Sequence, residues 1–476
     1  MTGEILTIQV GQCGNHVGKH FWSQIAKEHG IGNDGQRIEP NNETETSQGI
    51  FREDDTNPFF KQYEENKYTP RAVMIDLEPS VINDNHNYFP GFFDSRSSWV
   101  SEDRYGAGNS WANGYDEGQK NQDTFLNMID KQLDSTENFE GFQLLHSVAG
   151  GTGSGLGSNL LEALADRYQK KLLTTYSVFP SDQSEVVVQP YNTILTLRRL
   201  AEDSDASIVF DNNALLNLSG RVFQKNQTDY NQTNQLIASA LSSITNSIRF
   251  PSYMYTSLQS VFSTLVPTPE LHFLTPAFTP FTSDYVNGGM DYKRNTAYDV
   301  LLDLIDTPNL LISRGTKKPI YLNSFATVIG DVERNDITRA INKLQQRMQF
   351  AAWSPTMIHV NIGKRSRYLK SLNGNQNHVS GMMLSNNSGI VSLLEKVCLS
   401  FDKIYAKRAF MNAFQQSEIF NTDDFVESRE VTRSLIDEYM ASEEKSYLDE
   451  VLLEDENMVG NFDGDDEVDA EGDNIM

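Results

Sequence analysis

Apolar residues recur along the chain with two different spacings. Residues 4–10 (EILTIQV) alternate as a strand does, and after Gly11 the apolar residues Phe21, Trp22 and Ile25 fall on one helical face. The same succession of strand, small-residue turn and helix returns over residues 141–166. Further strands are predicted at 71–79, 175–180 and 207–210, and further helices at 193–201 and 235–247. This half of the chain therefore predicts an α/β domain with a parallel sheet.

The pattern changes in the second half. Strands are predicted at 271–281, 321–329, 357–362 and 379–384, with a helix at 337–348 between them and outer helices at 390–414 and 423–440. We expect an α+β domain covered by a C-terminal helical layer. Residues 32–68, in contrast, are polar and weakly patterned, and they predict a loop with one short helix.

Glycine-rich turns stand between strand and helix at three places. The longest is 146–157 (HSVAGGTGSGLG), and the others are 11–16 (GQCGNH) and 107–112 (AGNSWA). Glycine lets backbone approach a ligand closely, and a helix start offers unpaired N–H groups and a partial positive charge. Thr152 and Ser154 add hydroxyl donors. Such turns suit a phosphate, and turns of this kind can converge on one nucleotide at the carboxyl edge of a parallel sheet.

Three better-known glycine motifs do not fit the central turn. A Walker loop needs lysine where Leu156 stands, and the dinucleotide fingerprint needs a third glycine where Leu156 or Ser158 stands. A nucleophile elbow would need glycine at Thr152. A glycine turn without any ligand remains the alternative at this point.

Two carboxylates, Asp76 and Glu78, follow the strand predicted at 71–79. Carboxylates beside a phosphate loop indicate a Mg²⁺ site, usually held through water. The alternative for Glu78 is a solvated acid at a helix start. His16 and His20 have a spacing that could bind zinc, but no third ligand lies near them in the sequence.

Composition and charge narrow the function. The chain has 476 residues, a formal charge of −26, and fourteen acidic residues and one lysine after residue 441, so that segment alone carries −13. Such acidity disfavours nucleic acid as a partner. Cys13 and Cys398 are the only cysteines, which gives no disulfide framework. Without a basic leader or a long apolar run, we expect an intracellular protein that does not insert into membranes.

The glycine turns resemble those of the tubulins. GGTGSG (150–155) is similar to the tubulin signature, and GQCGNH (11–16) differs from its tubulin counterpart only in His16, which stands where glutamine is usual and can still donate one hydrogen bond. The match extends over nearly the whole chain. Within the family it is nearest to the gamma-tubulins, and among these to the budding-yeast type with its extended acidic tail. The segments that carry this resemblance are 21–24, 27–30, 175–180, 249–254, 267–274, 428–431 and 435–439.

The resemblance implies the tubulin fold and five regions. They are a Rossmann-like GTP-binding domain (1–230), a central helix (231–250), an intermediate α+β domain (251–380), a C-terminal helical layer (381–441) and a disordered acidic tail (442–476). The loop 282–295 stands where tubulins make side-by-side contacts.

The resemblance also implies GTP or GDP as ligand, with Mg²⁺ beside Asp76 and Glu78. In tubulins the turn at 107–109 faces the γ-phosphate, the loop before Gln189 meets the ribose, Asn212 and Asn234 read guanine, and Tyr230 stacks on it. The expected site residues are Gly11, Gln12, Cys13, His16, Asp76, Glu78, Ala107, Gly108, Asn109, Ser147, Ala149, Gly150, Gly151, Thr152, Gly153, Ser154, Gly155, Gln189, Asn212, Tyr230 and Asn234.

Ser260 bears on catalysis. Alpha-tubulins carry there a glutamate that completes hydrolysis of the GTP on the subunit beneath, and serine cannot act alone as a general base. The resemblance thus implies a template with at most weak GTPase activity. It would nucleate microtubules and cap their minus ends at the spindle pole body, with gamma-tubulin complex proteins, alpha/beta-tubulin dimers and lateral gamma-tubulin neighbours as partners. A self-assembling GTPase or a beta-type lattice subunit is the alternative.

Overall fold

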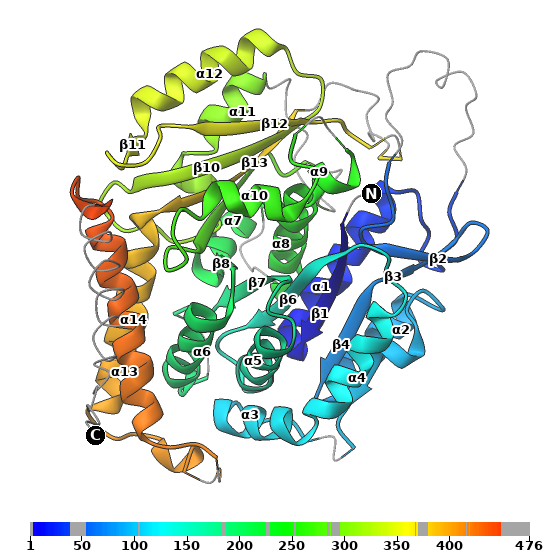
Figure 1. Cartoon of the computed structure of the whole chain (residues 1–476), viewed down its shortest axis with the longest axis vertical. Coiled ribbons are helices and arrows are strands. Elements are labelled where there is room, and N and C mark those ends of the chain that lie inside the picture. Colours follow the sequence, from blue (N-terminus) through cyan, green and yellow to red (C-terminus); the bar gives the residue numbers. More distant parts are fainter. Residues whose placement is uncertain are drawn as a thin grey trace, which may run out of the picture.

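A computed structural model describes most of the chain (Figure 1). The described residues are 3–38, 54–102, 105–182, 186–224, 229–251, 254–282, 286, 296–366, 368–369, 379–415, 417 and 419–448. One large sheet runs through them in the order β11-β10-β13-β9-β8-β7-β6-β1-β4-β5, with β12 paired to β10. Its strands are β1 (Glu4–Val10), β4 (Ala72–Asp76), β5 (Ser98–Val100), β6 (Phe139–Ser147), β7 (Leu172–Phe179), β8 (Ala206–Asp211), β9 (Phe273–Thr279), β10 (Ile320–Ile329), β11 (Gln349–Phe350), β12 (Ile358–Gly363) and β13 (Ser380–Asn387).

The first half of the sheet is parallel, as predicted. β1 pairs with β4 on one side and with β6 on the other, and β7 and β8 follow β6 in parallel register. Successive side chains of these strands point to opposite faces, so Ile5 and Leu6 enter two different hydrophobic cores. Both faces are apolar because helices cover both.

Helices cover the two faces in separate groups. One core packs α1 (Gly11–Glu28), α2 (Pro79–Tyr88), α7 (Asn212–Phe223), α8 (Tyr230–Ile244) and α10 (Leu258–Leu265) on the sheet. The other packs α3 (Trp111–Lys120), α4 (Gln122–Leu133), α5 (Gly157–Arg167), α6 (Gln189–Asp203), α13 (Val391–Tyr405) and α14 (Asp423–Ala441). The predicted C-terminal layer is α13 and α14, which run side by side along the left of Figure 1.

The second half continues the same sheet. β8 and β9 pair through Ser207 with Phe273 and Ile208 with Leu274, whereas β13 is antiparallel to both β9 and β10. α11 (Ala297–Asp303) and α12 (Arg334–Arg347) form a third core with β10 and β13. Because β13 spans 380–387, it crosses the boundary expected at residue 380 and joins the intermediate region to the helical layer.

Two segments differ from the sequence prediction. Part of the loop expected over 32–68 is an antiparallel hairpin of β2 (Phe60–Glu64) and β3 (Lys67–Pro70). Phe60 of this hairpin packs edge-on against Trp22, 5.8 Å between ring centroids, and this tertiary contact compensates for the polar sequence of the strand. The expected central helix is α8, which starts at Tyr230 and is followed after Thr245 by the short α9 (Asn246–Arg249).

The start of the expected acidic tail is packed against the body. Tyr447 is 2% exposed and donates a 2.5 Å hydrogen bond to Glu438. Its ring packs at a tilt against that of Trp353, with 4.9 Å between the ring centroids. The Trp353 indole donates to the Ser442 carbonyl oxygen at 2.8 Å. The predictions for 283–285, 287–295 and 449–476 lie outside the described residues.

Candidate nucleotide site

The expected site residues gather at one edge of the sheet. β1, β4, β6, β7 and β8 are parallel, so their carboxyl ends lie together, and the glycine turns follow β1 and β6 directly. From the central β1 the chain proceeds to β4 and β5 on one side and then to β6, β7 and β8 on the other. Ligands of open α/β sheets bind where the strand order reverses in this way.

The three glycine turns are in contact with one another. A Cβ built on Gly11, whose φ is +72°, would lie 2.8 Å from the backbone N of Gly153. A Cβ on Gly151 would lie 2.7 Å from the Ala107 Cβ and 2.9 Å from the Ser110 N. No side chain larger than hydrogen fits at Gly11 or Gly151 without displacing a neighbouring turn. The convergence predicted from the sequence is therefore present.

The central turn winds directly into a helix. Thr152–Leu156 forms a single wide helical turn, labelled η3, which leads into α5. Ser147, Ala149, Gly150 and Thr152 are partly exposed on it, whereas Gly151, Gly153, Ser154 and Gly155 are buried. The Ser154 hydroxyl donates to the Gly150 carbonyl oxygen, so it braces the turn from inside. This leaves backbone N–H groups at the helix start as the main donors for an anion.

Two side chains that the sequence reasoning did not select hold this turn. His146 is 1% exposed and bridges the Gly153 carbonyl oxygen at 3.0 Å and the Ser177 hydroxyl at 2.8 Å, and burial lowers its pKa to about 4. Asn192 of α6 bonds to both the 107–111 segment and the glycine turn. What marks both residues is that their polar side chains are buried beside the glycine turns. Burial is known only once the fold is known, so the sequence alone could not have selected them.

Asp76 ends β4 at the same edge. Its Oδ1 accepts the Leu77 N–H at 2.8 Å, while Oδ2 is buried with no hydrogen-bond partner among the described residues. Burial raises the pKa of Asp76 to about 6, although the Leu77 and Glu78 N–H groups, which donate to its Oδ1, oppose this shift. Glu78 is exposed, and a Cβ on Gly106 would meet its carboxylate. An unpartnered buried carboxylate oxygen and an exposed one nearby fit a hydrated Mg²⁺.

The described residues offer no complete metal site of their own. No group of three His, Cys, Asp or Glu side chains within them could hold an ion. Mg²⁺ ordinarily takes one or two carboxylates together with water and substrate phosphates, so this finding is compatible with an ion brought by a nucleotide.

The expected base-binding residues lie at the starts of α7 and α8 and in the first half of α1. Tyr230 is 56% exposed at the start of α8, and Asn212 and Asn234 are partly exposed. The His20 ring, 2.6 Å from Asn231 Oδ1, joins α1 to this helix start. His16 is half-buried, and desolvation together with Lys19 lowers its pKa, so at neutral pH it offers a single ring N–H.

The remaining expected residues stand along the same edge. Gln12, Gly108 and Asn109 are exposed, and Cys13 is half-buried with its pKa raised to about 12 by burial. The Gln189 side-chain amide donates to the Ser181 carbonyl oxygen at 3.5 Å, and its Oε1 is buried with no hydrogen-bond partner among the described residues. That oxygen could accept a hydrogen bond from a ligand hydroxyl.

Ser260 lies on α10, beside the amino-terminal end of β6 and therefore away from the carboxyl edge of the sheet. Its hydroxyl donates to the Ser257 carbonyl oxygen at 2.7 Å, so it closes the first turn of its own helix. Glu140 accepts the N–H of the neighbouring Gln259 at 2.8 Å, and its other oxygen is buried with no hydrogen-bond partner among the described residues. This hydrogen bond ties the Glu140 carboxylate to the first turn of α10.

The comparisons with known proteins agree with this geometry. Residues 4–220 match the family model of the Tubulin/FtsZ family, GTPase domain, and residues 269–399 match that of the tubulin C-terminal domain. The chain is 61% identical to the "Tubulin gamma chain" of Eremothecium gossypii over 97% of both chains, and 60% identical to that of Saccharomyces cerevisiae over the full length of both. It is also 60% identical to that of Candida glabrata, over 97% of this chain and 99% of that one.

None of the helices in the described part of the chain combines the length and the apolar character that crossing a bilayer requires.

Proposed function

Since this chain belongs to the tubulin family, and within it to the gamma-tubulins, we propose that it is a guanine-nucleotide-binding template from which microtubules grow. The observation that carries nucleotide binding is the contact between the turns at Gly11, Ala107 and Gly151 at the sheet edge. Their backbone N–H groups would hold the phosphates, with Thr152 adding a hydroxyl donor. The Ser147 hydroxyl donates instead to the Val178 carbonyl oxygen at 3.3 Å.

The remaining expected residues complete the proposed site. Asp76 and Glu78 would hold Mg²⁺ through water, and the ion would neutralise phosphate charge. Asn212 and Asn234 would read the guanine edge, because an amide both donates and accepts, while Tyr230 would stack on the base. Gln189 would meet the ribose.

The proposed template role rests on Ser260. At α10, Ser260 stands where alpha-tubulins have the glutamate, its hydroxyl bonds within its own helix, and the neighbouring Glu140 accepts the Gln259 N–H. We propose that the nucleotide edge receives alpha/beta-tubulin dimers and that the opposite end rests on gamma-tubulin complex proteins, with further copies of the chain beside it. Its proposed location is the microtubule-organising centre, the spindle pole body in a yeast cell.

Nucleotide binding can be tested with two glycines of equal backbone strain. Gly11 and Gly91 have φ values of +72° and +73°, but a Cβ on Gly91 would have no atom within 4 Å. Gly11→Ala should weaken GTP binding by at least about tenfold, since its Cβ displaces Gly153. Gly91→Ala carries the same strain and should leave GTP affinity unchanged. Equal GTP affinity in both variants would show that the nucleotide is not held at this junction.

The template role can be tested by reconstitution. We expect the chain with its accessory complex to start microtubules from purified alpha/beta-tubulin, and to turn over GTP slowly when alone at any concentration. Filaments of the chain alone, with GTP turnover that rises with concentration, would instead support the self-assembling GTPase.

A further inference from the structure

Asn192 sits in the first turn of α6 with its side chain fully buried. Its Nδ2 donates to the carbonyl oxygens of Asn109 at 2.7 Å and Ala149 at 2.8 Å. Its Oδ1 accepts the backbone N–H of Trp111 at 2.9 Å. One amide therefore connects the turn at 107–110 to the glycine turn that follows β6.

This position needs an amide side chain, because it requires two donated hydrogens and one acceptor. Both Nδ2 hydrogens are used on carbonyls of two different turns, while the oxygen takes a donor from the first. An aspartate of the same shape would set a carboxylate oxygen against two carbonyl oxygens. An alanine would remove all three hydrogen bonds and leave the buried Trp111 N–H without this partner.

These bonds also fix which way the peptide groups face. In a planar trans peptide the carbonyl and the following N–H point in opposite directions. Because the Ala149 carbonyl points at Asn192, the Gly150 N–H points away from α6. The Asn109 carbonyl is held in the same way, and the Ser110 N–H on its far side closes the turn onto the Ala107 carbonyl at 3.1 Å.

We propose that Asn192 is a positioning residue that sets the spacing between the 107–110 turn and the glycine turn, and through it the preference of the site for a triphosphate over a diphosphate. The proposal rests on the proposed function, because it needs a nucleotide phosphate chain between the two turns. In the proposed site the glycine turn holds the first two phosphates and the 107–110 turn meets the third. Only a ligand that reaches both turns gains from their fixed spacing.

The test compares GTP and GDP affinity in the full chain with Mg²⁺ present. Asn192→Asp should weaken GTP binding by about tenfold or more and GDP binding by clearly less, so that the ratio of the two dissociation constants changes. Thr174→Val is the matched control. Thr174 is equally buried and donates one bond, to the Phe142 carbonyl oxygen at 2.9 Å, but it lies near the opposite end of β7. It should leave both affinities within about twofold of the original.

The possible outcomes separate the two hypotheses. If the unaltered chain binds neither nucleotide, the proposed function is wrong. If it binds both and Asn192→Asp weakens them equally, or leaves them unchanged, the positioning role is wrong while the proposed function stands.

A second measurement needs no variant and therefore does not depend on whether Asn192→Asp folds. Amide hydrogen exchange of the unaltered chain should show that GTP protects residues 105–113 and 148–156 together, whereas GDP protects mainly the second segment. Protection of 148–156 alone with GTP would overturn the proposal.

Discussion

At the scale of single residues, Asp76 combines a stability cost with a proposed role in binding. Its folded pKa of about 6 lies above the usual value of 3.8, so the folded chain binds this proton more tightly than the unfolded chain does. The protonated Asp76 therefore contributes stability to the folded chain. This contribution to the free energy of unfolding is fully present below about pH 4 and is lost as pH rises through about 6. The loss amounts to about 3 kcal/mol for a group only 3% exposed.

Asp76→Asn should therefore make the nucleotide-free chain more stable at pH 7.5 and remove its share of the pH dependence between about 4 and 6. The same variant should lose most of the Mg²⁺-dependent part of GTP affinity, because an amide is a weaker ligand for Mg²⁺ than a carboxylate. Urea unfolding with chelator present and GTP titrations with and without Mg²⁺ measure the two effects. GTP affinity with an unaltered Mg²⁺ dependence would exclude Asp76 from the ion site.

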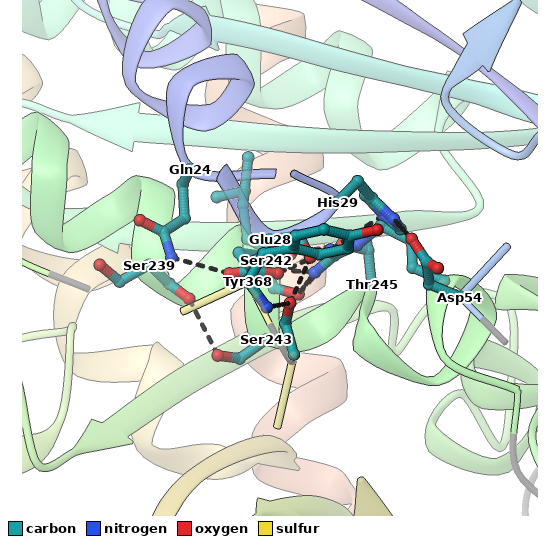
Figure 2. A network of polar contacts seen from close by, with 12 residues as sticks. Gln24, Glu28, His29, Asp54, Ser239, Ser242, Ser243, Thr245 and Tyr368 are labelled. Carbon is teal, nitrogen blue, oxygen red and sulfur yellow. Dashed lines mark hydrogen bonds and ion pairs between the residues drawn. The ribbon is translucent and has the colours of Figure 1, made fainter. Parts of the chain in front are cut away.

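At the scale of elements, a buried polar network joins α1 to α8 and α9. Arg249 is fully buried and pairs with Glu28 at 2.6 Å, and it also donates to the Ser242 carbonyl oxygen at 2.6 Å. Figure 2 shows Glu28 among Gln24 and Ser242, both of which donate to it, with His29 pointing toward Asp54. The network fixes the end of the first helix on the central helix.

Arg249→Met should cost about 3–5 kcal/mol in unfolding free energy, because it leaves the Glu28 carboxylate buried without its cation. The double variant Arg249→Met, Glu28→Gln should cost less than the sum of the two single changes, since it leaves no unpaired charge. Urea unfolding of all four chains measures this coupling. Additive costs would mean that the ion pair contributes nothing beyond its separate side chains.

Sequence patterns predicted helices and strands well where apolar residues recur at a regular spacing. β1 was predicted over its observed bounds, and the turns at Gly11 and Gly151 were predicted to converge because parallel strands end at one edge. The β2–β3 hairpin was missed because the order of its polar strands depends on packing of Phe60 against Trp22. Asn192 and Arg249 were not assigned these roles for a related reason, since their partners are distant in sequence and only the fold brings them together.

At the scale of the whole molecule, the two halves share one sheet and one core. β8 of the first half pairs with β9 of the second, and one hydrophobic core contains Trp22 and Phe21 from the first half together with Phe325 and Leu384 from the second. Shared apolar burial couples the unfolding of both halves, because neither half keeps its core when the other opens. The regions expected from sequence are therefore not expected to unfold separately.

Binding of GTP in the first half should consequently raise the unfolding midpoint of the second half as much as that of the first. With fluorotryptophan in place of the four tryptophans, the ¹⁹F signals of Trp22 and Trp353 should lose native intensity at one temperature. GTP at about one hundred times its dissociation constant should raise both midpoints together, by the equivalent of about 2.7 kcal/mol. Trp353→Phe assigns the distant signal. A Trp353 midpoint that stays fixed while that of Trp22 rises would show that the pairing of β8 with β9 does not transmit the stabilisation, and the second half would then behave as an independent unit.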